Sequence, residues 1–200
     1  MPLYKCKQSK KYYLLDYIKS TSYQAINTGF VPSEHLPFTI RNSFSLQSQS
    51  SDSEYTVWGS IDSNGQRLYL THINYHWRGT RATTTNNFGS FSLNSTNTEV
   101  TTCSSSSTTF NVNSSASTVS SSSISTVPLY IFARNNKRDG GVDRYSSMTL
   151  YSFSIDNYLD LVPVQEKSTG LNGLYDKITK TFFPSVTSTN FIAGNIIGEI

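Results

Sequence analysis

Short segments in which hydrophobic and polar residues alternate recur along the whole chain, separated by turn residues. The segment 36–47, LPFTIRNSFSLQ, places its large apolar side chains at one parity: Phe38, Ile40, Phe44 and Leu46. Because successive side chains of a strand point to opposite faces, this parity predicts a strand with one buried and one solvated face. About a dozen such segments, with no convincing helical period, predict an all-β fold. We expect a two-sheet antiparallel jelly-roll sandwich with little helix.

The clearest local prediction is a β-hairpin in residues 55–77. The runs YTVWGSI and RLYLTHINYHW flank the segment 62–66, whose Asn64-Gly65 pair supplies the positive φ angles of a tight turn. We expect the second run to form one strand, whose side chains divide between two faces. One face then carries Tyr69, Thr71, Ile73, Tyr75 and Trp77, and the other carries Leu70, His72, Asn74 and His76.

Serine and threonine dominate residues 101–126, where they occupy 18 of 26 positions. Such a composition alone is typical of a flexible linker between domains. Here, however, Phe110 and Val112 alternate with Asn111 and Asn113, and threonine itself favours strands. We therefore interpret the segment as a polar outer sheet or hairpin.

The composition is that of one ordinary soluble domain. The 200 residues are 36% hydrophobic and 14% charged, and their 13 Tyr and 11 Phe favour strands. A net charge of +3 with scattered Lys and Arg does not predict a nucleic-acid partner, and no run reaches the roughly 18 apolar residues of a membrane span. Cys6 and Cys103 lie far apart without further Cys or His at ligand spacing, so neither a disulfide framework nor a zinc site is expected.

The two ends differ from the rest of the chain. Residues 1–11 form a basic arm, residues 12–194 carry the predicted sandwich, and residues 195–200 form a short tail. Basic arms contact acidic partner surfaces, and exposed apolar termini need a partner. We therefore predict partner docking through the lysines and isoleucines of the two ends: Lys5, Lys7, Lys10, Lys11, Ile196, Ile197 and Ile200.

An ordered set of segments resembles a known family. It comprises LLDYIKSTSYQAINTGFVP, PLYIFARNN, MTLYSFSI, LVPV, GLYDKITKTFF and STNFIAG. In that order they resemble a LamG-like, concanavalin A-like jelly-roll domain of the kind found in phage virion proteins and in surface proteins of gut bacteria. The resemblance covers residues 12–194, although residues 81–125 match poorly. It implies two stacked antiparallel sheets and, for many relatives, glycan binding or adhesion.

A sugar site needs an exposed aromatic ring for the apolar sugar face, flanked by amide and guanidinium donors. Residues 74–81 offer this mixture, with Asn74 and His76 beside the main candidates. Trp58 and most of the set Tyr69, Tyr151 and Phe153 are assigned to the core because large rings must bury much area. The predicted carbohydrate-binding residues are Tyr75, Trp77, Arg78 and Arg81.

The resemblance also implies a calcium site, because relatives on this fold sometimes hold the ion at the rim of the sandwich through Asp and Asn oxygens. The loop NNKRDGGVD supplies such oxygens. The alternative is a solvated loop in which Arg138 and Arg144 pair with the acids. We expect no other cofactor, and the candidate calcium ligands are Asn135, Asn136, Asp139 and Asp143.

Catalysis is not expected. Asp52 and Glu54 are the acids whose spacing places two carboxylates on one face of a strand, as a retaining glycosidase needs. Related hydrolases carry a longer run of alternating acids with a third carboxylate, and this chain departs from that pattern. His72 and His76 lie roughly 13 Å apart on a strand, too far to share zinc. We therefore interpret both histidines as exposed residues of the polar face.

We expect a non-enzymatic phage virion surface protein, a capsid decoration, head-fibre or tail-associated domain that acts in assembly or host-surface adhesion. The chain starts at Met1 without an export signal, whereas lectin-like sandwiches normally work outside cells. Virion proteins reconcile these two properties because lysis releases them. The expected partners are other virion proteins, further copies of the chain and a host-surface glycan. Two alternatives remain: a glycan-binding lectin-like module at a bacterial cell surface, and a glycoside hydrolase.

Overall fold

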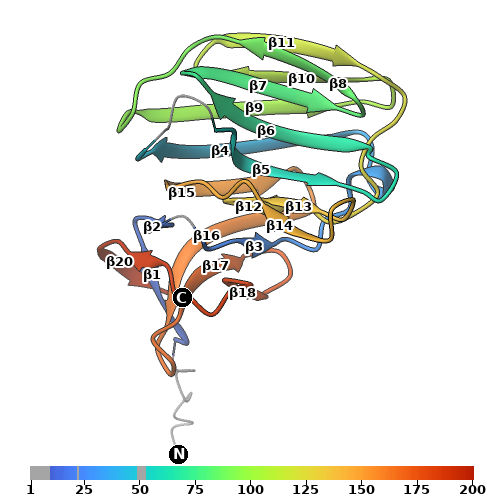
Figure 1. Ribbon diagram of the computed structural model, residues 1–200. Helices are drawn as coiled ribbons and strands as arrows, with labels where there is room; N and C mark the ends of the chain where they lie inside the picture. Colours follow the sequence, from blue (N-terminus) through green and yellow to red (C-terminus); the bar gives the residue numbers. More distant parts are fainter. Residues whose placement is uncertain (1–9, 22, 49–52) are drawn as a thin grey trace, which may run out of the picture.

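The computed structural model describes residues 10–21, 23–48 and 53–200 and shows two stacked β-sheets (Figure 1). Helical structure among these residues is confined to one 3-10 turn, η1 (Pro32–Glu34). The prediction of an all-β sandwich with two antiparallel sheets is confirmed. No helix in the described ranges is long and apolar enough to cross a membrane.

The larger sheet has 12 strands. Its main row runs β11 (Ser115–Ser120), β10 (Ser107–Val112), β9 (Thr96–Cys103), β4 (Phe38–Leu46), β15 (Met148–Ile155), β16 (Leu159–Glu166), β1 (Tyr12–Leu15) and β20 (Ile196–Glu199). The shorter strands β17 (Asn172–Asp176), β18 (Phe182–Pro184), β2 (Ile18–Lys19) and β19 (Ile192–Ala193) extend this row.

The smaller sheet has 8 strands and positions the candidate site. Its main row runs β14 (Gly141–Asp143), β13 (Arg134–Asn136), β5 (Tyr55–Ile61), β6 (Arg67–Ile73), β7 (His76–Arg81) and β8 (Thr84–Phe88). The short strands β12 (Tyr130–Ile131) and β3 (Ile26–Asn27) pair beside it. Within this otherwise antiparallel row, β13 runs parallel to β5.

The core lies between the sheets and is rich in aromatic rings. The four predicted core residues of β4 are all buried. Trp58 on β5 stacks on Phe110 of β10 with the ring centroids 6.3 Å apart, and Phe44 meets Trp77 edge to face at 5.7 Å. These contacts join the two layers, and the assignment of Trp58 to the core is confirmed.

One carboxylate is enclosed in this core. Glu99 on β9 is buried and accepts hydrogen bonds from Trp58 Nε1, from the Thr101 hydroxyl and from the Asn42 side-chain amide. Burial raises the pKa of the Glu99 carboxyl to about 7, although the three hydrogen bonds act in the opposite direction. The protonated form is therefore favoured inside the folded protein up to neutral pH.

The hairpin at residues 55–77 is confirmed, although only Gly65 of the Asn64-Gly65 pair has a positive φ angle, 76°, and its second strand ends earlier than predicted. At the first turn, the Asn64 and Gln66 amides both donate to Asp62 Oδ1 at 2.9 Å. Strand β6 then stops at Ile73, because Asn74 and Tyr75 adopt positive φ angles of 49° and 61° and reverse the chain. The prediction of one continuous strand through Trp77 is therefore wrong, and its parity does not extend into β7.

The serine- and threonine-rich segment is folded, as predicted. It forms the end of β9 and the strands β10 and β11, which pair antiparallel in a polar outer part of the larger sheet. Burial alternates strictly along β9. Phe110, Val112 and Val119 are buried beneath the hydroxyl-bearing face, so the segment is part of the sandwich and not a linker.

The two ends of the described chain meet at one edge of the larger sheet. Strand β20, in the segment predicted as a tail, pairs antiparallel with β1. Lys10 Nζ donates to the Glu199 main-chain carbonyl at 2.8 Å, and Lys11 Nζ forms an ion pair with Glu166 Oε1 at 3.3 Å. Ile196 and Ile197 are more than half exposed on β20, and Ile200 follows at 36%. Lys5, Lys7 and Cys6 lie outside the described residues, and docking through either end stays a prediction.

Candidate functional site

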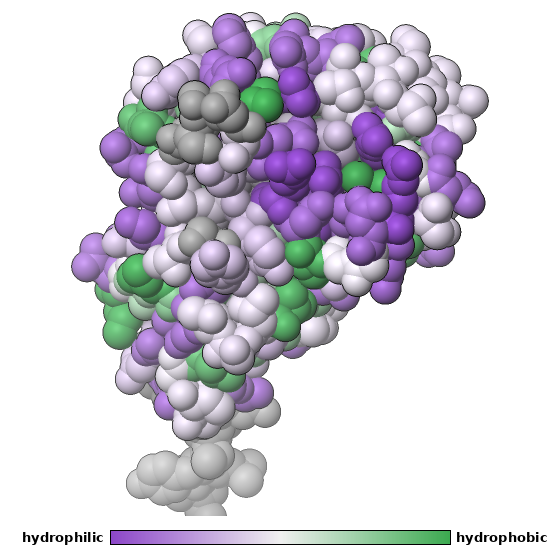
Figure 2. Space-filling view, viewed as in Figure 1, coloured by the Kyte–Doolittle hydropathy of each residue, from purple (hydrophilic) through white to green (hydrophobic). Residues whose placement is uncertain are grey.

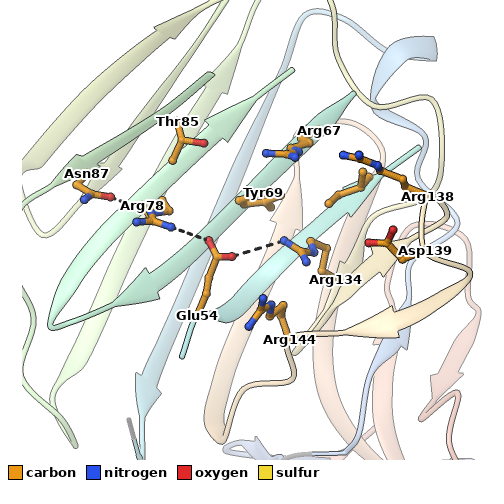
Figure 3. Close-up of a pocket in the computed structure, with 11 residues that line it drawn as sticks. Glu54, Arg67, Tyr69, Arg78, Thr85, Asn87, Arg134, Arg138, Asp139 and Arg144 are labelled. Atoms are coloured by element: carbon orange, nitrogen blue, oxygen red, sulfur yellow. Dashed lines mark hydrogen bonds and ion pairs between the residues drawn. The ribbon is translucent and has the colours of Figure 1, made fainter. Parts of the chain in front are cut away.

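A pocket with a volume of about 540 Å³ opens on the outer face of the smaller sheet. Figure 2 shows hydrophilic side chains gathered over β5 and β13 on this face, and Figure 3 shows the pocket itself. Tyr69 forms its floor, and Thr85 and Asn87 line it from β8. Two carboxylates, Glu54 and Asp139, also line it. Arginine is the commonest residue type in its lining, with Arg67, Arg78, Arg134, Arg138 and Arg144.

Strand alternation explains why these side chains point outward. Along β6, Leu68 and Leu70 point into the core. The alternate residues Arg67, Tyr69 and Thr71 therefore point to the opposite face, where the pocket lies. On β7 the register places Arg78 opposite Thr71. Polar positions of separate strands thereby converge on one side of the sheet.

Gly59 of β5 makes room for the floor of the pocket. It lies opposite both Tyr69 on β6 and Arg134 on β13. A Cβ atom at Gly59 would approach the Tyr69 Cβ to 2.2 Å, far inside van der Waals contact. Glycine therefore lets the Tyr69 ring settle on the sheet, where the Arg134 guanidinium covers it 5.2 Å from the ring centroid.

Glu54 links two of the arginines across the pocket (Figure 3). Its Oε1 lies 3.5 Å from Arg78 Nη1, and its Oε2 lies 3.6 Å from Arg134 Nη1. The Thr71 hydroxyl donates to Oε1 at 2.9 Å. Arg78 Nε also donates to Asn87 Oδ1 at 2.9 Å. These contacts hold Arg78 and Arg134 in defined positions.

Arg134 is fixed further by a two-pronged ion pair. Its Nε and Nη2 donate to the two oxygens of Asp143 at 2.9 and 2.8 Å. Burial alone lowers the pKa of the Arg134 guanidinium, but the hydrogen bonds and charge of Asp143 outweigh it and hold the pKa above its ordinary value. Arg134 is therefore a permanently charged and positioned part of the pocket.

Arg67, Arg138 and Arg144 have no such partners. None of the three guanidinium groups forms a hydrogen bond or ion pair with another described residue, and Arg67 Nε is buried without a partner among those residues. They come from three segments: the start of β6, the β13–β14 turn, and the residue after β14. The pocket thus combines two fixed arginines with three that have no hydrogen-bond or ion-pair partner among the described residues.

The predicted sugar-binding residues do not form one site. Arg78 lines the pocket, whereas Tyr75 lies at the β6–β7 turn and is 53% exposed. Trp77 and Arg81 are completely buried, so the prediction that they offer an exposed ring and an exposed guanidinium is wrong. The turn at Asn74 and Tyr75 directs both inward, and Arg81 donates to Thr108 Oγ1 and to the Ser105 and Ser107 carbonyls.

Three of the four predicted calcium ligands do come together. Asn136 Nδ2 donates to Asp139 Oδ2 at 2.9 Å and to Asp143 Oδ2 at 2.7 Å. Asn135 instead points toward Pro128 and donates to its carbonyl. Arg134, and not Arg138 or Arg144, pairs with Asp143. Within the described ranges no group of three or more His, Cys, Asp or Glu side chains is placed to hold a metal, and calcium binding stays a prediction.

The residues considered for catalysis and zinc are separated. Asp52 lies outside the described residues, so its geometry with Glu54 is not defined. His76 is exposed, as predicted, but His72 is buried between Tyr55 and Phe91, contrary to prediction. Burial lowers the pKa of His72 to about 3, which keeps its imidazole neutral. The reason is register, because His72 pairs with Trp77 on the inner face.

Sequence reasoning missed most of the pocket. Arg67, Tyr69 and Arg134 were not proposed as site residues, and Arg138 and Arg144 entered only as partners of nearby acids. The available signal was the outward parity of Arg67, Tyr69 and Thr71 on one strand. The pairing of β13 with β5, which brings Arg134 alongside Tyr69, left no local pattern in the sequence.

A second hollow of about 360 Å³ lies elsewhere on the sandwich and has a different lining. Its rings include Phe30 and His35, which stack with centroids 4.8 Å apart, and Tyr158, 4.5 Å from His35. Phe183 and several threonines complete it. This hollow offers aromatic surface but none of the arginines of the first pocket.

No protein-family model matches the chain, and no curated protein matches it significantly. A Bacteroides ovatus protein, provisionally described as carbohydrate-binding, aligns with a TM-score of 0.64 at 10% identity over 94% of this chain and 62% of that protein. Trypanosoma rangeli sialidase in complex with sialic acid aligns with a TM-score of 0.47 at 17% identity over 60% of this chain and 20% of the sialidase. Alginate lyase A1-II′ aligns with a TM-score of 0.45 at 13% identity, covering 65% of this chain and 66% of the lyase.

This chain therefore spans a fifth of the sialidase and less than two thirds of the Bacteroides ovatus protein. At these identities the similarity concerns the fold. It shows a shared β-sandwich fold that extends over nearly the whole chain.

Proposed function

We propose that this chain is a non-enzymatic carbohydrate-recognition module that binds a saccharide in the arginine-lined pocket of the smaller sheet. The observation that carries the proposal is this pocket, built from residues of five strands, of the position before β5 and of the segment that follows β13. Its volume of about 540 Å³ lies within the roughly 300–1,000 Å³ of small-ligand sites. The similarity of the fold to that of the Bacteroides ovatus protein supports the same assignment.

The lining suits a ligand that is rich in oxygen. Guanidinium groups, the Asn87 amide and the Thr85 hydroxyl all offer N–H or O–H donors. The Tyr69 ring is only 3% exposed beneath Arg134, so recognition depends on hydrogen bonds and not on stacking against an aromatic ring. Saccharides carry many closely spaced hydroxyl oxygens, which can accept hydrogen bonds from these donors.

The contacts of the two carboxylates that line the pocket favour a role in positioning neighbouring side chains over a role in acid–base catalysis. Glu54 accepts from Thr71 and lies between two arginines, and Asp139 accepts from Asn136. Both are therefore already engaged as acceptors. This arrangement fits a binding role in which the carboxylates fix their neighbours.

Two matched double variants test the proposal on a glycan array. Thr85→Ala/Asn87→Ala removes two exposed donors from the pocket, whereas Thr98→Ala/Asn111→Ala removes the same two side-chain types from the outer face of β9 and β10. We expect saccharide binding by the unaltered chain, at least about tenfold weaker binding by the pocket variant, and no change in the control.

Three results would contradict the proposal. They are a complete lack of glycan binding, equal effects of the two double variants, and binding that is lost only in Tyr158→Ala. The last result would place the site in the aromatic hollow. The role predicted first, on a phage virion, has no support from the fold or the comparisons and stays a prediction.

A further inference from the structure

We propose that the ligand of this pocket is an acidic saccharide, whose carboxylate or sulfate groups are bound by Arg67, Arg138 and Arg144. This inference rests on the proposed saccharide-binding function and specifies its substrate class. It follows from the charge of the pocket, from the division of its arginines into paired and unpaired groups, and from the placement of the unpaired ones.

The pocket concentrates positive charge far more than the rest of the chain. Five arginines and two carboxylates line it, so its lining carries a net charge of +3. Counting Asp143, which lies behind Arg134, still leaves +2. The whole 200-residue chain carries a net charge of +3. A surplus equal to most of the molecular charge thus lies around one pocket, where it favours an anion.

The arginines divide into two groups with separate roles. Arg78 and Arg134 are held by Glu54 and Asp143, so their charge is already largely balanced. Arg67, Arg138 and Arg144 have no carboxylate partner among the described residues. The surplus charge therefore resides on these three side chains, and they are the groups that an anionic ligand would neutralise.

The chemistry of the guanidinium group favours carboxylate or sulfate. Its planar fork donates two parallel hydrogen bonds to two oxygens of one anionic group. Figure 3 shows Arg134 between Arg144 on one side and Arg67 with Arg138 on the other. Because the unpaired arginines lie on both sides of Arg134, more than one acidic group can be bound. We expect a saccharide that repeats its acidic groups, such as a polyuronate or a sulfated polysaccharide.

Nucleic acid is the competing anionic polymer, and the pocket fits it less well. Single-stranded nucleic acid is held by base stacking on exposed aromatic rings together with backbone contacts. Tyr69, the aromatic residue of this pocket, is covered by Arg134 and is 3% exposed.

Isothermal titration with matched pairs of saccharides tests the inference. The probes are polygalacturonate, alginate and heparin oligosaccharides, each with its carboxyl-reduced or desulfated counterpart, and an oligothymidylate. We expect at least one acidic member to bind about tenfold or more tightly than its neutral counterpart, with an affinity that falls as NaCl rises from about 50 to about 300 mM.

Arginine variants then locate the site. Arg138→Gln/Arg144→Gln removes two unpaired guanidinium groups outside the strands, and we expect a loss of about 100-fold in affinity for the acidic probe. Arg138→Lys/Arg144→Lys keeps the charge and loses the fork, so an intermediate loss is expected. Arg41→Gln is the control, because Arg41 is an exposed arginine of the larger sheet, paired with Asp156. The Arg41→Gln variant should bind the acidic probe with the affinity of the unaltered chain.

The outcomes separate this inference from the function on which it rests. Equal binding of acidic and neutral probes, lost in Thr85→Ala/Asn87→Ala, would overturn the acidic ligand and leave saccharide recognition standing. Lack of binding to every saccharide would overturn both. Tighter binding of the oligothymidylate than of any saccharide, abolished by the arginine variants, would identify the pocket as a nucleic-acid site and also overturn the inference.

Discussion

Strands β9–β11 of the larger sheet and strands β5–β7 of the smaller sheet alternate in the same way but expose different chemistry. Both regions direct large apolar side chains inward, Phe110 and Val112 in one and Leu68 and Leu70 in the other. The outward positions of β9–β11 carry mainly Thr and Ser, whereas those of β5–β7 include three of the residues that build the pocket: Arg67, Tyr69 and Arg78.

The difference shows which positions determine the fold and which are free for recognition. The inward parity suffices to bury a core, so both regions fold into the same sandwich. Outward hydroxyls satisfy one another in pairs, as Thr109 and Thr118 do at 2.9 Å, and need no further neighbours. Arg134, by contrast, is placed by two carboxylates, a covered ring and a glycine. We therefore expect the pocket face to tolerate substitution less well than the hydroxyl face.

The largest predicted effect comes from filling the space under the pocket floor. In Gly59→Val, the added Cβ would be 2.2 Å from the Tyr69 Cβ and 3.0 Å from its Cα. Because a main-chain atom is among those it meets, strands β5 and β6 must separate. We expect the free energy of unfolding, measured by urea denaturation, to fall by about 3 kcal/mol or more.

Gly141→Val provides the control for this substitution. Gly141 lies on β14 in the same sheet, and a Cβ there meets nothing within 4 Å. Its free energy of unfolding should change by less than about 1 kcal/mol. Similar losses in the two variants would show that valine is poorly tolerated throughout this sheet and that the Gly59–Tyr69 contact has no special weight.

The second-largest predicted effect on stability concerns Glu99. Its side chain is buried in the core, whereas that of Glu54 lines the pocket. The pKa of Glu99 rises from the ordinary 4.5 to about 7 in the folded protein, so the folded state binds the proton more tightly than the unfolded state. The contribution of Glu99 to stability is therefore greatest below pH 4.5 and is lost as pH rises from 4.5 to 7. The shift corresponds to about 3 kcal/mol over that window.

Glu99→Gln isolates this effect. Gln keeps an acceptor for Trp58 Nε1 but does not ionise. The difference in unfolding free energy between the variant and the unaltered chain should increase by about 3 kcal/mol from pH 4.5 to pH 8, in favour of the variant. Other titrating groups, His72 included, cancel in this difference. A constant difference across the range would mean that Glu99 is ionised in the folded protein without cost.

The sequence predicted the layers of the fold because burial imposes a period that is visible locally. Phe38, Ile40 and Phe44 on β4 and Phe110 on β10 show it directly, and even the hydroxyl-rich segment could be assigned to strands. The period ends wherever a turn intervenes. Asn74 and Tyr75 reverse the chain without glycine or proline, and the assignment of Trp77 to the face of Tyr69 failed because it continued the earlier parity.

The pocket was harder to predict because it is assembled from distant parts of the chain. Glu54 and Arg134 are 80 residues apart in sequence yet lie within 3.6 Å of each other. Their contact depends on the parallel pairing of β13 with β5, for which neither segment carries a distinctive pattern. Arg78, which lines the pocket, was proposed for sugar binding because its neighbours suggested that chemistry, and two of those neighbours are buried.

The smallest predicted effects compare two hydroxyl pairs of the same geometry. Thr80 and Thr85 join β7 to β8 beside the pocket at 2.9 Å, as Thr109 and Thr118 join β10 to β11. Valine keeps the branched shape and removes both polar partners of a pair, so neither double Thr→Val variant should lose more than about 0.5 kcal/mol of unfolding free energy.

Ligand binding should nevertheless distinguish these two variants, because Thr85 lines the pocket and the Thr109–Thr118 pair does not. We expect Thr80→Val/Thr85→Val to weaken binding of the acidic saccharide about threefold and Thr109→Val/Thr118→Val to leave it unchanged. Titration of both variants with the same oligosaccharide measures this. Equal affinities would mean that the β8 side of the pocket does not contact the ligand, and the binding surface would then be restricted to the arginines around β5, β6 and β13.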